Sequence, residues 1–213
     1  MLIYYMTNIW GRGSAMPVTI TAISLLAMVF VLDYLIFPPK GAKRWNLKYL
    51  VLGSHAGLGK EPAPFNETLC LRTSALRRGQ LWRLVTYLSL HGGLYHLLAN
   101  CAALWALGSF LEGELGAWRW ALLLLASGVA VGLSGGVLFG TAEFGIGASC
   151  AIYGAVGFFT AMLLRDPQVL QVLSLPWQIF LLCYLLSNFV LRGGWRCHCD
   201  GFACGILLAF VLI

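Results

Sequence analysis

The fold of this chain is limited most strongly by its apolar stretches, several of which are long enough to cross a lipid bilayer. Hydrophobic residues make up 60% of the 213 residues and charged residues only 10%, whereas a soluble globular domain carries about 25% charged residues. One spanning helix needs about 20 predominantly apolar residues. The sequence therefore predicts an all-α integral membrane protein. Six spans are expected, over residues 17–37, 91–111, 118–139, 148–164, 175–191 and 195–213.

The chain is expected to form one membrane domain, residues 17–213, after a short N-terminal tail, residues 1–16. Arg12 is the only basic residue of the tail, and the first apolar run is long enough to span, so a cleaved signal peptide is not predicted. The connection from Pro38 to Leu90 is different, because its roughly 50 residues mix aromatic and basic side chains. Such stretches tend to lie in the membrane interface. We therefore expect short helices here, partly embedded in the membrane.

The positive charge of the chain is concentrated in this first loop. The formal net charge is +6, and nine of the 14 Lys and Arg residues lie between Lys40 and Arg83. Because spanning segments flank this cluster, anionic lipid headgroups are a better partner for it than nucleic acid. The positive-inside rule, taken alone, would place the loop in the cytosol.

Several polar side chains interrupt the apolar stretches. Ionisable groups at bilayer depth are costly and usually face a cavity or one another, so they mark candidate functional sites. Ser149 and His198 lie on different spans and are the parts of a nucleophile and base pair. Small residues four apart, such as Gly201 and Gly205, allow membrane helices to approach closely. Close packing of the fourth and sixth spans would bring Ser149 within reach of His198, although the glycine spacing by itself fits simple helix packing equally well.

These residue types can carry out acyl transfer. Ser149 would attack a carbonyl carbon, and His198 would act first as general base and then as general acid to the leaving amine. His96 and Asn100 are four residues apart and share one helix face, where an imidazole N–H and an amide could stabilise the oxyanion together with the backbone N–H of Ser149. His91 lies about 140° further round the same expected helix, so we assign it a supporting role.

A two-residue dyad is favoured over a triad. Asp200 is two residues after His198 and points away from it, and Glu143 lies in the loop before the serine. Tyr153 is one helical turn after Ser149, so its ring could pack against the imidazole.

No metal, nucleotide or redox cofactor is predicted. The run Cys197-His198-Cys199-Asp200 contains metal-binding residue types. Adjacent residues on a helix, however, point about 100° apart and converge poorly on one ion. The seven cysteines are mostly expected to act as small apolar residues.

Taken together, the polar residues follow the order of a known family, and the chain resembles the rhomboid intramembrane serine proteases over about residues 80–205. The matching residues are Trp82-Arg83, His91…His96…Asn100, Gly108…Glu112…Gly116, Gly147-Ala148-Ser149…Tyr153-Gly154 and His198…Gly201…Gly205.

The resemblance implies a bundle of six transmembrane helices whose fourth span starts in a water-filled cavity. It also implies a Ser149/His198 dyad, with His96 and Asn100 at the oxyanion. Trp82 and Arg83 would anchor the first loop, and Glu112 would support the bundle near the turn between the second and third spans. The implied substrate is a transmembrane segment of another membrane protein.

Two features depart from the family. Cys150 follows the nucleophile where active members usually have glycine, and its thiol could crowd the oxyanion site and reduce or alter activity. The resemblance also places both termini in the cytosol and the basic first loop outside, against the positive-inside rule. We favour the family orientation, with the active site opening to the extracytoplasmic side, because the site pattern is more specific than the charge pattern.

The sequence leaves two other functions open besides proteolysis. A pseudoprotease would bind membrane helices without cutting them, and Cys150 is the residue that favours it. A small proton-coupled transporter could use intramembrane histidines, but six dissimilar spans without an internal repeat do not indicate one.

Overall fold

The computed structural model describes residues 16–36, 50–51, 64–140, 145–190 and 195–212. These residues are almost entirely helical, and an isolated antiparallel bridge between Leu71 and Gly145 is their only β contact. The all-α membrane fold predicted from the sequence is confirmed. The long helices are α2 (Pro17–Ile36), α7 (Leu94–Leu115), α8 (Ala117–Leu133), α9 (Ser149–Arg165), α10 (Leu175–Val190) and α11 (Trp195–Leu212). Residues 1–15, most of the expected N-terminal tail, lie outside the described part.

Four of these helical segments are long and apolar enough to cross a membrane: Pro17–Tyr34, Leu94–Leu115, Ala117–Leu138 and Trp195–Leu212. The third segment includes a π-helical extension of α8, η3 (Ser134–Leu138). The other two long helices contribute shorter apolar segments, Ser149–Arg165 and Leu175–Ser187. The described part of the chain is therefore compatible with six spans, four of which have full spanning length.

The second expected span, 91–111, is shifted in the structure. Helix α7 begins at Leu94, after Gly92 and Gly93, and continues to Leu115. His91 consequently precedes the helix, so the expected angular position of His91 around it was wrong. The pair of glycines supplies the physical reason, because glycine favours irregular backbone over a helical turn.

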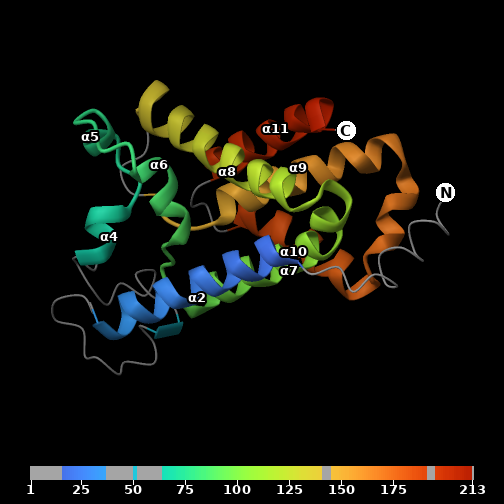
Figure 1. Ribbon diagram of the computed structural model, residues 1–213, viewed down its shortest axis with the longest axis horizontal. Helices are drawn as coiled ribbons and strands as arrows, with labels where there is room; N and C mark the ends of the chain where they lie inside the picture. Colours follow the sequence, from blue (N-terminus) through green and yellow to red (C-terminus); the bar gives the residue numbers. More distant parts are fainter. Residues whose placement is uncertain (1–15, 37–49, 52–63, 141–144, 191–194, 213) are drawn as a thin grey trace.

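Helix α9 forms the centre of the bundle and is buried along most of its length. It packs most extensively against α11 and also against α7 and α8, while α2 runs alongside α7 (Figure 1). A Cβ atom added to Gly205 would collide with the backbone carbonyl of Gly154, and one added to Gly201 would collide with that of Cys150. The absence of these side chains lets the two helices meet backbone to backbone.

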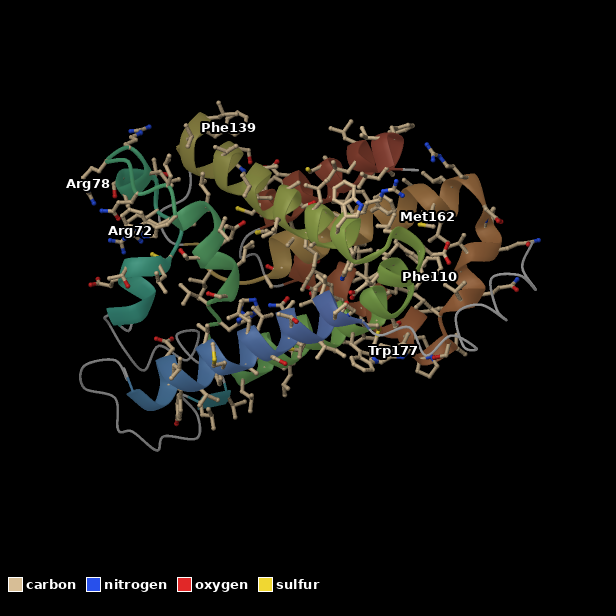
Figure 2. The ribbon with its side chains drawn as sticks, viewed as in Figure 1. Arg72, Arg78, Phe110, Phe139, Met162 and Trp177 are labelled. Atoms are coloured by element: carbon tan, nitrogen blue, oxygen red, sulfur yellow. The ribbon has the colours of Figure 1, made fainter. Side chains whose placement is uncertain are left out.

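The described part of the first loop contains short helices, as expected from its aromatic and basic composition. They are α4 (Pro64–Leu69), α5 (Thr73–Leu76) and α6 (Arg83–Thr86), followed by the 3-10 turn η2 (Tyr87–Ser89). All lie at one end of the molecule, where Figure 2 also shows Arg72, Arg78 and Phe139. Phe139 is 71% exposed, so an exposed aromatic ring and basic side chains gather there. This combination suits a membrane interface.

Glu112 joins α7 to the beginning of α2. Its carboxylate is buried and accepts hydrogen bonds from the backbone N–H groups of Val18 (2.8 Å) and Thr19 (2.9 Å) and from the Thr19 hydroxyl (2.7 Å). Trp120 donates in turn to the Thr19 hydroxyl at 2.9 Å. A carboxylate at a helix N-terminus satisfies donors that lack a partner within the helix. Glu112 thus caps α2 from a neighbouring helix.

We expect Glu112→Ala to lower the free energy of unfolding by about 2 kcal/mol, because buried donors at the start of α2 lose a charged acceptor. Thermal or denaturant unfolding in detergent would measure the change. Glu114→Ala, on the same helix but exposed, is the matched control and should change the value by less than about 0.5 kcal/mol. Equal effects of the two substitutions would contradict the capping role.

Candidate active site

Packing of α9 against α11 brings Ser149 and His198 together. Ser149 is the first residue of α9 and is 7% exposed, while His198 lies in the first turn of α11. The Ser149 Oγ and the His198 Nε2 are 2.8 Å apart. This distance is within hydrogen-bond reach, so the imidazole is placed to accept the hydroxyl proton.

The ring of Tyr153 packs against one face of the His198 imidazole. Its ring is stacked on that of His198, with centroids 4.3 Å apart and ring planes within 5° of parallel. The Tyr153 hydroxyl donates to the backbone carbonyl of Tyr184 at 3.0 Å. The ring therefore restrains the plane of the imidazole while its own hydroxyl is tied to α10.

His96 lies against the backbone that leads to the nucleophile. Gly147 has φ +114°, and a Cβ atom there would lie 2.7 Å from the His96 Cε1 and 3.7 Å from the Ser149 Oγ. Only glycine combines this backbone conformation with so close an approach. The Gly147 N–H donates to the Tyr87 carbonyl at 2.9 Å, which joins the segment before α9 to the first loop. His96 and Ser149 thus flank the same small space.

Asn100, one turn after His96 on α7, is fully buried. Its Oδ1 accepts a hydrogen bond from the Tyr184 hydroxyl at 2.7 Å. Its Nδ2 has no hydrogen-bond partner among the described residues. Most buried polar groups are paired, so this amide is a donor that a bound group could use.

His91 contacts His96 from outside the helix. The two ring centroids are 5.0 Å apart in an edge-on arrangement, and the His91 Nδ1 lies 3.3 Å from the Ser89 carbonyl oxygen. Burial, together with the neighbouring His96, lowers the pKa of His91 to about 3. His91 is therefore neutral at physiological pH and packs behind His96.

The carboxylate of Asp200 forms a hydrogen bond with a residue of η3. Its Oδ2 accepts a hydrogen bond of 2.5 Å from the Ser134 hydroxyl on η3. Both this aspartate and Cys197 line a cavity of about 420 Å³ between η3 and the start of α11. The carboxylate thus ties α11 to the end of α8.

Arg83 and Trp82 take different positions in the first loop. Arg83 is buried and donates through Nη1 to the Cys70 carbonyl and through Nε to the Gln80 side chain, both at 2.7 Å. Trp82 is 53% exposed, and its Nε1 lies 3.4 Å from the Thr68 carbonyl oxygen. The Arg83 guanidinium therefore forms hydrogen bonds inside the loop, whereas the Trp82 indole lies on the surface of the loop.

Cys150 points away from solvent. It is buried in an apolar cluster with Leu71, Leu76, Tyr87 and Val131, and Cys197 packs against this cluster. The side chain thus fills the contact between α9, α8 and the first loop.

Tyr184, which is partly buried, and Tyr87, which is buried, have polar partners that the sequence did not indicate. Tyr184 bonds Asn100, and the Tyr87 hydroxyl donates to the Gly128 carbonyl at 2.9 Å. The general tendency of a buried tyrosine hydroxyl to find a partner was the available signal. Which partner it finds depends on helix packing.

Comparison with known proteins identifies the family. The model of the Rhomboid domain matches residues 78–213, and the chain belongs to the rhomboid family. It is an integral membrane protein with several membrane-spanning helices.

Both plant and bacterial relatives match. RHOMBOID-like protein 5 of Arabidopsis thaliana is 30% identical over 147 residues, covering 67% of this chain and 48% of the relative. RHOMBOID-like protein 1 of the same plant is 33% identical, covering 65% and 36%. Rhomboid protease GlpG of Yersinia pestis is 27% identical over 205 residues, covering 93% and 64%. The chain thus spans half or less of these plant relatives and about two thirds of the bacterial protease.

Proposed function

We propose that this chain is an intramembrane serine endopeptidase that cleaves transmembrane segments of other membrane proteins through a Ser149/His198 dyad. The observation that carries the proposal is the 2.8 Å contact between the Ser149 Oγ and the His198 Nε2, on helices of a membrane bundle. The relatives named rhomboid proteases support the same reaction class.

The reaction proceeds in two steps. The Ser149 Oγ attacks the carbonyl carbon of the scissile peptide as His198 Nε2 takes the hydroxyl proton, and the same imidazole then protonates the leaving amine. Water hydrolyses the resulting acyl-enzyme with His198 again as base. His96 and the Nδ2 of Asn100, which has no hydrogen-bond partner within the described part of the chain, stabilise the negative oxygen of each tetrahedral intermediate.

The substrate reaches the dyad from within the membrane, and the active site faces the extracytoplasmic side. Orientation can be tested with a Ser74→Cys variant in a background lacking other exposed cysteines, because Ser74 is exposed in the first loop. A membrane-impermeant thiol reagent should label it on intact cells. Labelling only after lysis would contradict this orientation.

The proposal is tested by treating the purified protein in detergent with a fluorophosphonate and mapping the modified peptide. Modification of Ser149 alone, lost on denaturation, is expected, because only an activated hydroxyl reacts quickly. Absence of labelling on folded protein at several pH values would instead favour a pseudoprotease that binds membrane helices.

Cys150 is the residue that favours the pseudoprotease, and Cys150→Gly tests it. Because the Cys150 side chain lies in the apolar cluster, we expect the substitution to lower the free energy of unfolding by about 2 kcal/mol through lost packing and helix propensity. The labelling rate of Ser149 should change less than about tenfold, a barrier change of roughly 1.4 kcal/mol. A much larger gain in labelling would show that the thiol suppresses activity.

A further inference from the structure

Tyr184 lies on α10, outside the proposed dyad, yet it bonds the only oxygen of the Asn100 side chain. The phenol donates to Asn100 Oδ1 at 2.7 Å. The side-chain amide of Asn100 has a carbonyl on one branch and an NH₂ on the other. In the structure the phenol donates to the carbonyl, which leaves the nitrogen on the opposite branch. That nitrogen has no partner among the residues described.

The structure assigns to Tyr184 the role of a positioning residue that orients the Asn100 amide. In this orientation the Asn100 Nδ2 is left available to the oxyanion of the reaction. The assignment rests on the proposed proteolysis and extends it, because it says what keeps the donor of the oxyanion site in the productive orientation. Without the phenol, the amide could turn its oxygen toward the substrate and repel the developing charge.

Tyr184 is itself held firmly. Its ring packs against those of Tyr153, with centroids 5.4 Å apart, and Phe180, at 6.1 Å. Its backbone carbonyl accepts the Tyr153 hydroxyl at 3.0 Å and the Ser187 hydroxyl at 2.7 Å. Rigid support of this kind is what an orienting hydrogen bond requires.

The same turn of α10 therefore supports both halves of the site. Tyr153 stacks on the His198 imidazole, while the Tyr184 hydroxyl fixes the amide on α7. The Tyr153 and Tyr184 side chains thus connect His198 on α11 with Asn100 on α7, so the contacts involve four helices.

The test is a kinetic cycle with Tyr184→Phe, Asn100→Ala and the double variant, using cleavage of a transmembrane substrate. Tyr184→Phe keeps the ring and removes the hydroxyl, so kcat should fall about tenfold with KM within about twofold. Asn100→Ala should lower kcat about 10²-fold, as expected for loss of one oxyanion donor. In the Asn100→Ala background, Tyr184→Phe should have less than about a twofold further effect, because the residue acts through the amide.

Two further variants distinguish an effect on the orientation of the Asn100 amide from an effect on folding. Asn100→Asp keeps an acceptor for Tyr184 but replaces the donor with an acceptor, so it should be at least as inactive as Asn100→Ala. Tyr95→Phe, at a tyrosine 66% exposed on α7, is the matched control and should leave kcat unchanged. An unchanged kcat in Tyr184→Phe, or an equal loss in both backgrounds, would overturn the inference.

A thermal-unfolding cycle over the same variants does not depend on activity. The Tm shifts of Tyr184→Phe and Asn100→Ala should be non-additive, because both remove one hydrogen bond. Additive shifts would refute that bond. A wild type that is not labelled at Ser149 would instead refute the proposed protease function, so the two failures are distinguishable.

Discussion

Replacing Ser149 or His198 with alanine is expected to lower the rate of transmembrane-substrate cleavage by about 10⁴-fold or more, the largest effect of any single change in this chain. In the proposed reaction the serine hydroxyl supplies the atom that attacks, and the imidazole 2.8 Å away removes its proton. The measurement is the initial rate of cleavage in detergent or reconstituted vesicles.

The two substitutions should also be strongly non-additive. Once either member of the dyad is lost, removal of the other costs little, because the two act as a unit. The double variant should therefore be about as slow as the slower single one. Ser109→Ala is a suitable control, since that hydroxyl bonds only the Ala106 carbonyl, at 3.0 Å, among the contacts described for it. Multiplicative losses in the double variant would show that the residues do not cooperate.

Gly205→Ala is expected to have the largest effect on stability, lowering the free energy of unfolding by about 3 kcal/mol. The added methyl would collide with the carbonyl of Gly154, and a backbone oxygen cannot turn aside as a side chain can. Relief requires α9 and α11 to move apart. Because these helices carry Ser149 and His198, the same movement would lengthen the contact between the two side chains, so fluorophosphonate labelling should fall as well.

Gly113 provides the matched control for this prediction. It is also a helical glycine, but a Cβ atom added there meets nothing within 4 Å. Gly113→Ala should leave labelling unchanged and be neutral or stabilising by up to about 1 kcal/mol, since alanine favours a helix more than glycine does. Both variants can be compared by thermal unfolding and labelling rate. Equal behaviour would show that close packing of α9 on α11 is not what holds the dyad together.

Much of the fold is predictable because a bilayer imposes strong and local conditions. Apolar stretches of spanning length form helices, since backbone polar groups in lipid must bond within the segment. The all-α membrane class and the positions of the long helices follow from this rule. The boundary at His91 was placed wrongly because hydropathy does not detect the glycine pair that delays the helix to Leu94.

The candidate residues could be named from the sequence, but several of their partners could not. Ser149 and His198 stand out as reactive groups in apolar surroundings, and small residues suggest which helices could meet. Glu112, in contrast, bonds the start of α2 across 93 and 94 positions of the chain. Tyr184 reaches Asn100 across 84 positions. No local spacing rule relates such residues.

The sequence by itself determined the class of this protein, a helical membrane protein with a serine and a histidine at bilayer depth, because hydrophobicity and residue chemistry are properties of each segment. Only the tertiary structure decided the 2.8 Å contact between Ser149 and His198, the stacking of Tyr153 and the orientation of the Asn100 amide. These depend on how closely helices approach and how they are rotated about their axes. Helix packing sets the approach and the rotation, and these decide whether two side-chain atoms come within hydrogen-bond distance.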